Sequence, residues 1–166
     1  TGTDITTLPE FTQADIIHLH WINQGMLSLK DIHRILESGK PVVWTMHDMW
    51  PSTGIATTPV NAPTISKNAI TASFYKKKAL YQQAPITFVT CSHWLEERAK
   101  SSALLRNQTV ISIPNPINTN LFKPRNKKEA RAHCKLPQEG KLILFGSVKI
   151  TDKRKGIDYL IESCKL

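Results

Sequence analysis

In residues 41–51 the chain reads Pro-Val-Val-Trp-Thr-Met-His-Asp-Met-Trp-Pro. The stretch opens with a continuous apolar run, which is typical of a parallel strand that is covered on both faces. It ends in a polar, aromatic corner where His47 stands beside Asp48. In an open α/β sheet, the side chains that follow the carboxyl end of a strand face the crevice where ligands bind. His47 and Asp48 are therefore candidate functional residues; the alternative is an ordinary polar loop before a Trp-Pro turn.

Three further apolar runs, at 14–21, 85–91 and 109–113, indicate strands on either side of this stretch. Helical patterns stand between them. The first has an N-cap at Ser28, a C′ glycine at Gly39 and an apolar stripe at helical spacing in between. Because strands and helices alternate without a gap, the sequence predicts an α/β fold, a Rossmann-like parallel sheet with flanking helices.

The segments that connect these strands carry more detailed expectations. Residues 55–66 contain two prolines and no period, so we expect a loop or flap there. A helix capped at Ser66 should follow, with Ile70, Phe74 and Tyr81 facing inward and Lys76, Lys77 and Lys78 facing mainly outward. A later helix, capped at Ser92, should bury Leu95, Ala99 and Ala103.

The chain changes character after the fourth strand. Prolines mixed with Asn and Lys surround one short helical pattern at 127–133, as in a domain linker. An apolar run at 141–145 then predicts a fresh buried strand. We therefore expect residues 1–120 to be the later part of one domain, 121–139 a linker, and 140–166 the start of a second α/β domain.

The segment after this last run has the outline of a phosphate site. Gly146 lets a ligand approach the backbone closely. A helix from about Gly156 would present a partial positive charge at its N-terminus. The loop between them carries four cations, Lys149, Lys153, Arg154 and Lys155. The alternative is a solvated surface loop.

The net charge of +9 is concentrated in the same region. From residue 121 onward there are 12 Lys or Arg against 5 Asp or Glu, and before it 10 against 8. This asymmetry favours an anionic partner, such as a phosphate, a nucleic acid or an acidic membrane surface. The alternative is a solvated lysine-rich face, which is the commoner fate of such runs. The basic stretch has no interleaved aromatics and no helix-turn-helix or RNP-like pattern, so nucleic acid is not the expected partner.

The cysteines and histidines indicate neither a disulfide framework nor a metal site. The three cysteines lie far apart without a Cys-x-x-Cys pair, as in a protein of the reducing cytoplasm. His18 and His20 project to one face of a strand, but no third ligand has a metal-binding spacing. We expect His18 to pack in the core. No apolar run approaches the roughly 18 residues that span a membrane, and no signal peptide opens the chain.

Three motifs occur in order: His-Asp-Met-Trp-Pro at 47–51, Ile-Pro-Asn-Pro-Ile-Asn-Thr-Asn-Leu-Phe-Lys-Pro at 113–124, and Ile-Leu-Phe-Gly-Ser followed by Asp-Lys-Arg-Lys-Gly-Ile-Asp-Tyr-Leu within 143–160. The set resembles the family 4 (group 1) glycosyltransferases, in particular the bacterial branch that builds surface polysaccharides. The resemblance implies the GT-B architecture, in which two Rossmann-like domains face each other across a cleft. The acceptor would bind on the N-terminal side and the nucleotide-sugar on the C-terminal side.

The resemblance also implies a reaction. The chain would be a fragment of a longer, retaining enzyme that needs no metal or other cofactor. Its donor would be a UDP- or GDP-sugar and its acceptor a saccharide or a lipid-linked sugar. The enzyme would be cytoplasmic, with peripheral contact at the inner face of the plasma membrane. The alternative, from another class of function, is a basic binding module for nucleic acid or an anionic membrane.

On the donor side, the resemblance assigns Lys155 to the donor diphosphate. The rest of the phosphate-binding set would be Arg154, Lys153, Gly146 and Ser147. Many relatives have an arginine directly after the strand glycine, where this chain has Ser147. Either Lys149 or Lys153 would supply the missing charge, or this branch binds phosphate with fewer charges.

On the acceptor side, the resemblance assigns His47 to substrate positioning near the transferred sugar. Asp48 would orient the imidazole or accept a hydrogen bond from an acceptor hydroxyl. His20 and Trp50 would complete the acceptor side.

Overall fold

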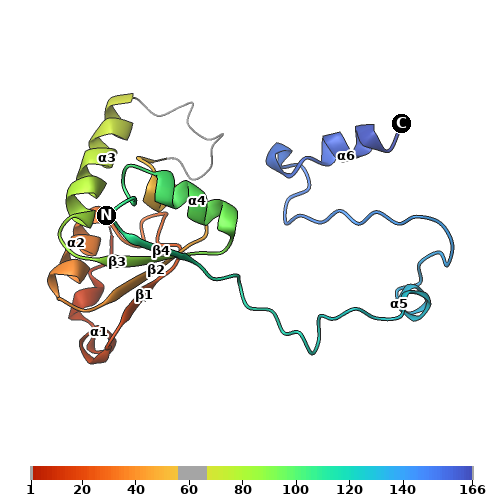
Figure 1. Ribbon diagram of the computed structural model, residues 1–166, viewed down its shortest axis with the longest axis horizontal. Coiled ribbons are helices and arrows are strands. Elements are labelled where there is room, and N and C mark those ends of the chain that lie inside the picture. Colours follow the sequence, from red (N-terminus) through yellow and green to blue (C-terminus); the bar gives the residue numbers. More distant parts are fainter. Residues whose placement is uncertain (1, 56–66, 166) are drawn as a thin grey trace. The chain divides into compact units, whose positions relative to one another are not determined.

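The computed structural model describes residues 2–55 and 67–165. The chain forms two compact units, Thr1–Pro116 and Ile117–Leu166, and Figure 1 shows both. The expected N-cap at Ser66 and nearly all of the expected loop at 55–66 lie outside the described residues. The finer division into 1–120, 121–139 and 140–166 stays a prediction.

The first unit alternates strands and helices in the predicted order. It opens with two short helical turns, η1 (Ile5–Thr7) and α1 (Pro9–Gln13). Its strands are β1 (Ile17–Leu19), β2 (Val42–Met46), β3 (Ile86–Thr90) and β4 (Thr109–Ser112). The connections contain α2 (Leu29–Glu37), η2 (Trp50–Ser52), α3 (Lys67–Tyr81) and α4 (His93–Ser101). The strands pair in parallel in the order β1-β2-β3-β4, which confirms the predicted α/β fold with a Rossmann-like parallel sheet.

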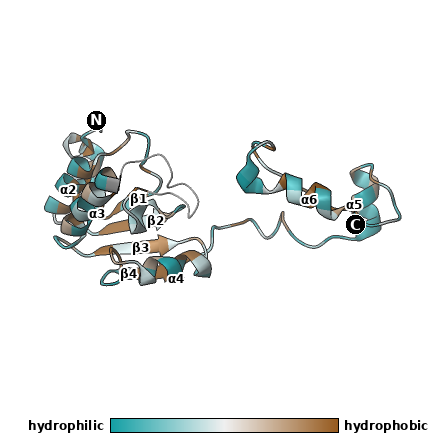
Figure 2. Ribbon diagram, turned by 90° about the horizontal axis from the view of Figure 1, so that it is seen from above, coloured by the Kyte–Doolittle hydropathy of each residue, from teal (hydrophilic) through white to brown (hydrophobic). Residues whose placement is uncertain are grey.

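The core lies between one face of the sheet and the helices that connect the strands. In Figure 1, α2, α3 and α4 all lie above the strands, and Figure 2 shows hydrophobic residues concentrated in the sheet. At the centre, the ring of Trp44 in β2 stacks on Phe88 in β3 at 5.7 Å, and Tyr81 of α3 meets both rings edge-on. Ile32 and Ile35 of α2 are fully buried beside them. The Val-Val-Trp run thus lies in a central strand because its alternate residues fill this core.

The opposite face of the sheet is partly open. Val43 and Thr45 of β2 are half-buried, while Ile111 of β4 is 41% exposed. The burial of β2 alternates along the strand, so the expected coverage of both faces is only partial. His18 lies exposed in β1, and the expectation that it packs in the core is wrong.

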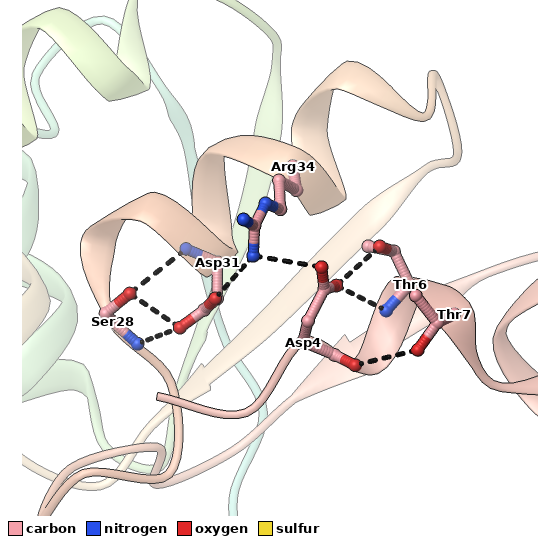
Figure 3. A network of polar contacts seen from close by, with 6 residues as sticks. All are labelled: Asp4, Thr6, Thr7, Ser28, Asp31 and Arg34. Carbon is pink, nitrogen blue, oxygen red and sulfur yellow. Dashed lines mark hydrogen bonds and ion pairs between the residues drawn. The ribbon is translucent and has the colours of Figure 1, made fainter. Parts of the chain in front are cut away.

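A polar network fixes the start of α2 and ties it to the N-terminal segment (Figure 3). Ser28 and Asp31 form a capping box in which the Ser28 backbone N–H donates to Asp31 at 2.8 Å. Arg34, one turn later, bridges Asp31 at 3.2 Å and Asp4 at 2.9 Å. The capping box satisfies amides that the first turn of a helix leaves without partners, which confirms Ser28 as the N-cap.

Two details of the predicted helices are wrong. Lys77 was expected to face outward with its neighbours, but its exposed fraction is 0%, whereas Lys76 and Lys78 are exposed as predicted. Its ammonium is satisfied inside the protein by backbone carbonyls. Ala103 lies beyond the end of α4 and is exposed, and Leu104 and Leu105 are buried in its place.

The second unit contains short helices and no strand among its described residues. Its elements are α5 (Lys127–His133), η3 (Lys153–Lys155) and α6 (Ile157–Ser163). Asn126 caps α5 by accepting two backbone amides. The guanidinium of Arg131 donates to three backbone carbonyls of the loop that follows, those of Pro137, Gln138 and Gly140.

The predicted buried strand at 141–145 is wrong. These residues adopt no regular structure, and Leu144 is 97% exposed. An apolar run becomes a strand only when neighbours supply backbone partners and a face to pack against. The described part of the second unit offers this run neither, while the short helix predicted at 127–133 and the helix from Gly156 both form.

Candidate functional site

The carboxyl ends of the parallel strands bring the candidate residues of the first unit together. His20 and Trp21 follow β1, while His47 and Asp48 follow the neighbouring strand β2. Because both strands run in the same direction, these residues meet at one edge of the sheet, where the sequence predicted His47 and Asp48 to lie.

Histidines form a row across this edge. The His20 Nδ1 lies 3.1 Å from the His47 Nε2, and the two rings stack at 5.4 Å. The ring of His18 lies 4.3 Å from that of His20, and its Nε2 is 2.8 Å from the Thr45 hydroxyl. Partial desolvation, together with a positive charge on His20, lowers the pKa of His18. The surroundings of His18 therefore favour its neutral imidazole. His47 lies at the other end of the row, next to Asp48.

Asp48 is held by donors from three directions. Its Oδ1 accepts the backbone N–H of Trp50 at 2.8 Å, which orders the turn that leads into η2. Its Oδ2 accepts the indole N–H of Trp21 at 3.2 Å and the side-chain amide of Asn23 at 3.4 Å. A carboxylate fixed in this way presents a defined direction to any hydroxyl group that approaches it.

The two tryptophans at this edge differ in what they offer a ligand. Trp50 is half-buried, with its ring 6.0 Å from that of Trp44 and the Nζ of Lys77 3.3 Å from its centroid. Trp21 is 48% exposed. Sequence reasoning named Trp50 and missed Trp21 and Asn23, although both follow β1 directly and so had to lie at the same sheet edge.

A small cleft lies between the residues that follow β1 and β2. It is lined by His20, Trp21, Asn23, His47 and Asp48, with Trp44 beneath, and it encloses about 10 Å³. This is room for roughly one water molecule. A ligand larger than a water molecule would therefore lie across the rim of the cleft, where the histidines and the carboxylate are presented, and not inside it.

Lys77 lies beneath this corner. Its Nζ donates to the carbonyls of Trp50 at 2.6 Å and Thr53 at 3.1 Å. Burial lowers the pKa of Lys77 to about 7, and the nearby Asp48 carboxylate opposes the shift. The sequence did carry a signal for this burial, because Phe74, Lys77 and Tyr81 have the spacing of one helix face.

The candidate phosphate loop lies in the second unit. Gly146 is exposed, and the hydroxyl of Ser147 donates to the backbone carbonyl of Lys149 at 3.2 Å. Arg154 is engaged by Asp152, with an N···O distance of 2.6 Å. The hydrogen bonds from Arg154 lower the pKa of Asp152 to about 2.

This pairing leaves Lys149, Lys153 and Lys155 as the cations of the loop that have no ion pair among the described residues. Gly156, with φ at 73°, turns the chain from the basic η3 into α6. The left-handed conformation at this position suits glycine. The assignment of the loop to the donor phosphates stays a prediction.

Comparison with known proteins settles the family. Residues 6–121 match the model of Glycosyltransferase Family 4, which is more than half of the chain. The chain belongs to glycosyltransferase family 4. No match was found among curated proteins, and none among solved structures.

Membership of this glycosyltransferase family covers the first unit and its site. The match contains His20, His47, Asp48 and Lys77, and it ends at residue 121, before the candidate phosphate loop. The family implies a transferase with a sugar donor and an acceptor. Across the described residues there is no group of three or more His, Cys, Asp or Glu that could hold a metal ion. No helix in the described part of the chain is long and apolar enough to cross a membrane.

Proposed function

We propose that the chain carries the acceptor side and the donor-phosphate loop of a GT-B glycosyltransferase. The enzyme transfers a sugar from a UDP- or GDP-sugar to a saccharide or lipid-linked acceptor in bacterial surface-polysaccharide synthesis. The observation that carries the proposal is the corner of His47 and Asp48, fixed by its neighbours at the carboxyl edge of the sheet and contained in the family match. An oriented carboxylate beside an imidazole fits the recognition of sugar hydroxyls.

The hydrogen bond between the two histidines suggests how His47 acts. When His20 donates from Nδ1, His47 accepts at Nε2, and its other nitrogen, Nδ1, then carries a proton. That N–H can donate to an oxygen of the transferred sugar or the acceptor. Asp48 accepts a hydrogen bond from an acceptor hydroxyl. In this assignment the pair positions the substrates and stabilises the transition state by hydrogen bonding.

On the donor side, Lys155 binds the diphosphate, supported by Lys153 and the backbone at Gly146 and Ser147. Negative charge builds on the departing diphosphate as the glycosidic bond breaks, and a fixed cation stabilises it. Arg154 contributes only if phosphate displaces its carboxylate partner Asp152. We propose that these cations replace a metal and that the product retains the anomeric configuration of the donor.

The test is sugar transfer by the full-length protein that contains this chain. UDP and GDP release is followed with a panel of nucleotide-sugars and saccharide acceptors, with and without EDTA. The substitutions His47→Ala and Lys155→Ala should each reduce kcat/KM by on the order of 10²-fold. His33→Ala, which removes a histidine of α2 that contacts Gln83 and Glu37, should not.

Three results would each overturn part of the proposal. Absence of transfer from every nucleotide-sugar contradicts the activity. Full activity of the His47→Ala enzyme contradicts the role of the corner, and loss of activity in EDTA contradicts the metal-independent mechanism. The anomeric proton of the product, read by NMR, decides retention.

We also propose a cytoplasmic location with peripheral contact at the inner face of the plasma membrane. The support is the excess of 12 Lys or Arg over 5 Asp or Glu from residue 121 onward. Such a surface should bind vesicles that contain phosphatidylglycerol and release them as salt is raised. Equal sedimentation with neutral phosphatidylcholine vesicles would contradict it.

A further inference from the structure

One face of α3 holds the turn that follows the His47–Asp48 corner. Ser73, Lys77 and Tyr81 are four residues apart, so they lie on the same side of the helix. All three donate side-chain hydrogen bonds to backbone carbonyls of residues 50–54. The acceptors are, in that order, the carbonyl of Gly54 at 2.8 Å, those of Trp50 and Thr53 at 2.6 and 3.1 Å, and that of Pro51 at 3.2 Å. We call these three residues the donor row.

The turn lies so close to α3 that only glycine fits at its end. A Cβ on Gly54 would lie 2.8 Å from the carbonyl oxygen of Ile70 and 2.9 Å from its side chain. Contacts this short are not tolerated without a shift of the backbone. The hydrogen bonds of the donor row and the close contact at Gly54 therefore belong to one feature, the packing of the turn at 50–54 against α3.

A lysine is an expensive choice for the middle of this row. Lys77 is completely buried, and a buried ammonium loses the hydration that stabilises it in water. An apolar side chain of similar volume often fills such a position at no loss of stability. What only the lysine provides is two hydrogen bonds to the turn and a cation placed over the Trp50 ring.

Lys77 is linked to Asp48 through one residue, Trp50. Lys77 binds the carbonyl and the ring of Trp50, while the backbone N–H of Trp50 donates to Asp48 Oδ1. The other oxygen of Asp48 accepts the indole N–H of Trp21 at the rim of the cleft. A displacement of Trp50 would thus be felt at both oxygens of the carboxylate.

We propose that Lys77 is a positioning residue for the candidate site. By holding the turn at 50–53, Lys77 fixes the carboxylate of Asp48 beside His47. The carboxylate then faces the side from which an acceptor hydroxyl binds. The proposal rests on the proposed function for its link to the acceptor. The mechanical link from Lys77 to Asp48 does not depend on that function and can be measured separately.

The first experiment measures the mechanical link in the whole chain. Indole N–H signals are recorded by ¹⁵N NMR for the wild type and for Lys77→Met, with Trp21 and Trp94 assigned by Trp→Phe substitution. The signal of Trp21 should move in Lys77→Met, and that of Trp94, on α4, should stay. Lys76→Met, which changes an exposed lysine of the same helix, should move neither. A Trp21 signal that stays in place in a folded Lys77→Met protein overturns the proposal.

If Lys77→Met does not fold, Ser73→Ala removes the neighbouring donor of the row with little change in volume. It should move the same Trp21 signal by a smaller amount, and no movement overturns the proposal.

The second experiment measures sugar transfer by the full-length enzyme. Lys77→Met should raise the acceptor KM about tenfold, because misplaced binding groups weaken productive orientation, and should leave the donor KM unchanged. A lower kcat with both KM values unchanged would mean fewer folded molecules and a merely structural lysine. If the wild type transfers no sugar, the proposed function fails, while the indole signals still decide whether Lys77 positions Asp48.

Discussion

Two apolar runs of five residues have different fates in this chain. Val42–Met46 forms β2 at the centre of the sheet, with Trp44 only 2% exposed. The run at 141–145, equally apolar, forms no strand, and its Leu144 is 97% exposed. The first run is flanked by β1 and β3, which pair with its backbone, while helices such as α3 pack on one face. Composition thus reports that a segment can enter a sheet, while its neighbours decide whether it does.

The largest difference between the two runs should appear when each loses one large apolar side chain. Trp44→Ala removes the ring that packs on Phe88 and Tyr81, and it should lower the free energy of unfolding by about 3–5 kcal/mol. Leu144→Ala removes a side chain that packs on little, so its effect should stay within about 0.5 kcal/mol. Urea denaturation followed by tryptophan fluorescence measures both, since all four tryptophans lie in the first unit. Comparable losses would show that the run at 141–145 is part of the cooperative core.

The same contrast explains how much of the structure could be predicted from the sequence. The order of strands and helices, the Ser28 cap and the meeting of His20 with His47 follow from local patterns and from one rule about parallel sheets. The absence of a strand at 141–145 could not be predicted in this way, because strand pairing depends on residues that are distant in the chain. The role of Asn23 depends on its distance from Asp48, which the order of residues does not contain.

The burial of Lys77 was missed for another reason. Lysine is almost never fully buried without partners, so a run of three lysines predicts a solvated surface. The partners here are carbonyls of a turn more than twenty residues away. The periodicity of α3 favoured burial, and the residue type outweighed it in the interpretation.

A second prediction extends the comparison to charged groups. The pKa of Lys77 is about 7 in the folded protein, against an ordinary value of 10.5. Between these values the unfolded chain binds a proton at this residue that the folded chain does not. The free energy of unfolding should therefore rise with pH above 7, by at most about 1.4 kcal/mol per pH unit from this group. Lys77→Met should flatten this slope.

The measurement is a series of urea titrations from pH 7.5 to 9 on the wild type and the variant. Asp48 and Tyr81, which lie near Lys77, are present in both proteins, so the difference between the two slopes isolates the lysine. Lys76→Met controls for the loss of one positive charge from α3. An identical slope in wild type and Lys77→Met would show that the ammonium is solvated in the folded protein.

The smallest expected effects concern the polar N-cap, a feature that occurs in both units. Ser28→Ala removes the acceptor for the Asp31 amide in α2, whose inner face is buried, and should cost about 1 kcal/mol in the fluorescence-monitored unfolding. Asn126→Ala removes the acceptor for two amides of α5, a helix that is exposed except at Arg131. Because α5 is an exposed helix of the second unit, while all four tryptophans lie in the first, this substitution should change that unfolding by less than about 0.5 kcal/mol.

Asn126→Ala should still destabilise α5 itself. This local effect distinguishes a cap that contributes little from a cap whose helix is not coupled to the unfolding of the first unit. Short helices are marginal without tertiary packing, so losing the cap should reduce the helicity of residues 127–133, as read from their Cα chemical shifts. Equal losses of global stability from the two substitutions would mean that the two units unfold together. Local melting of α5 at constant fluorescence-monitored stability would instead show that the sheet of the first unit unfolds independently of α5.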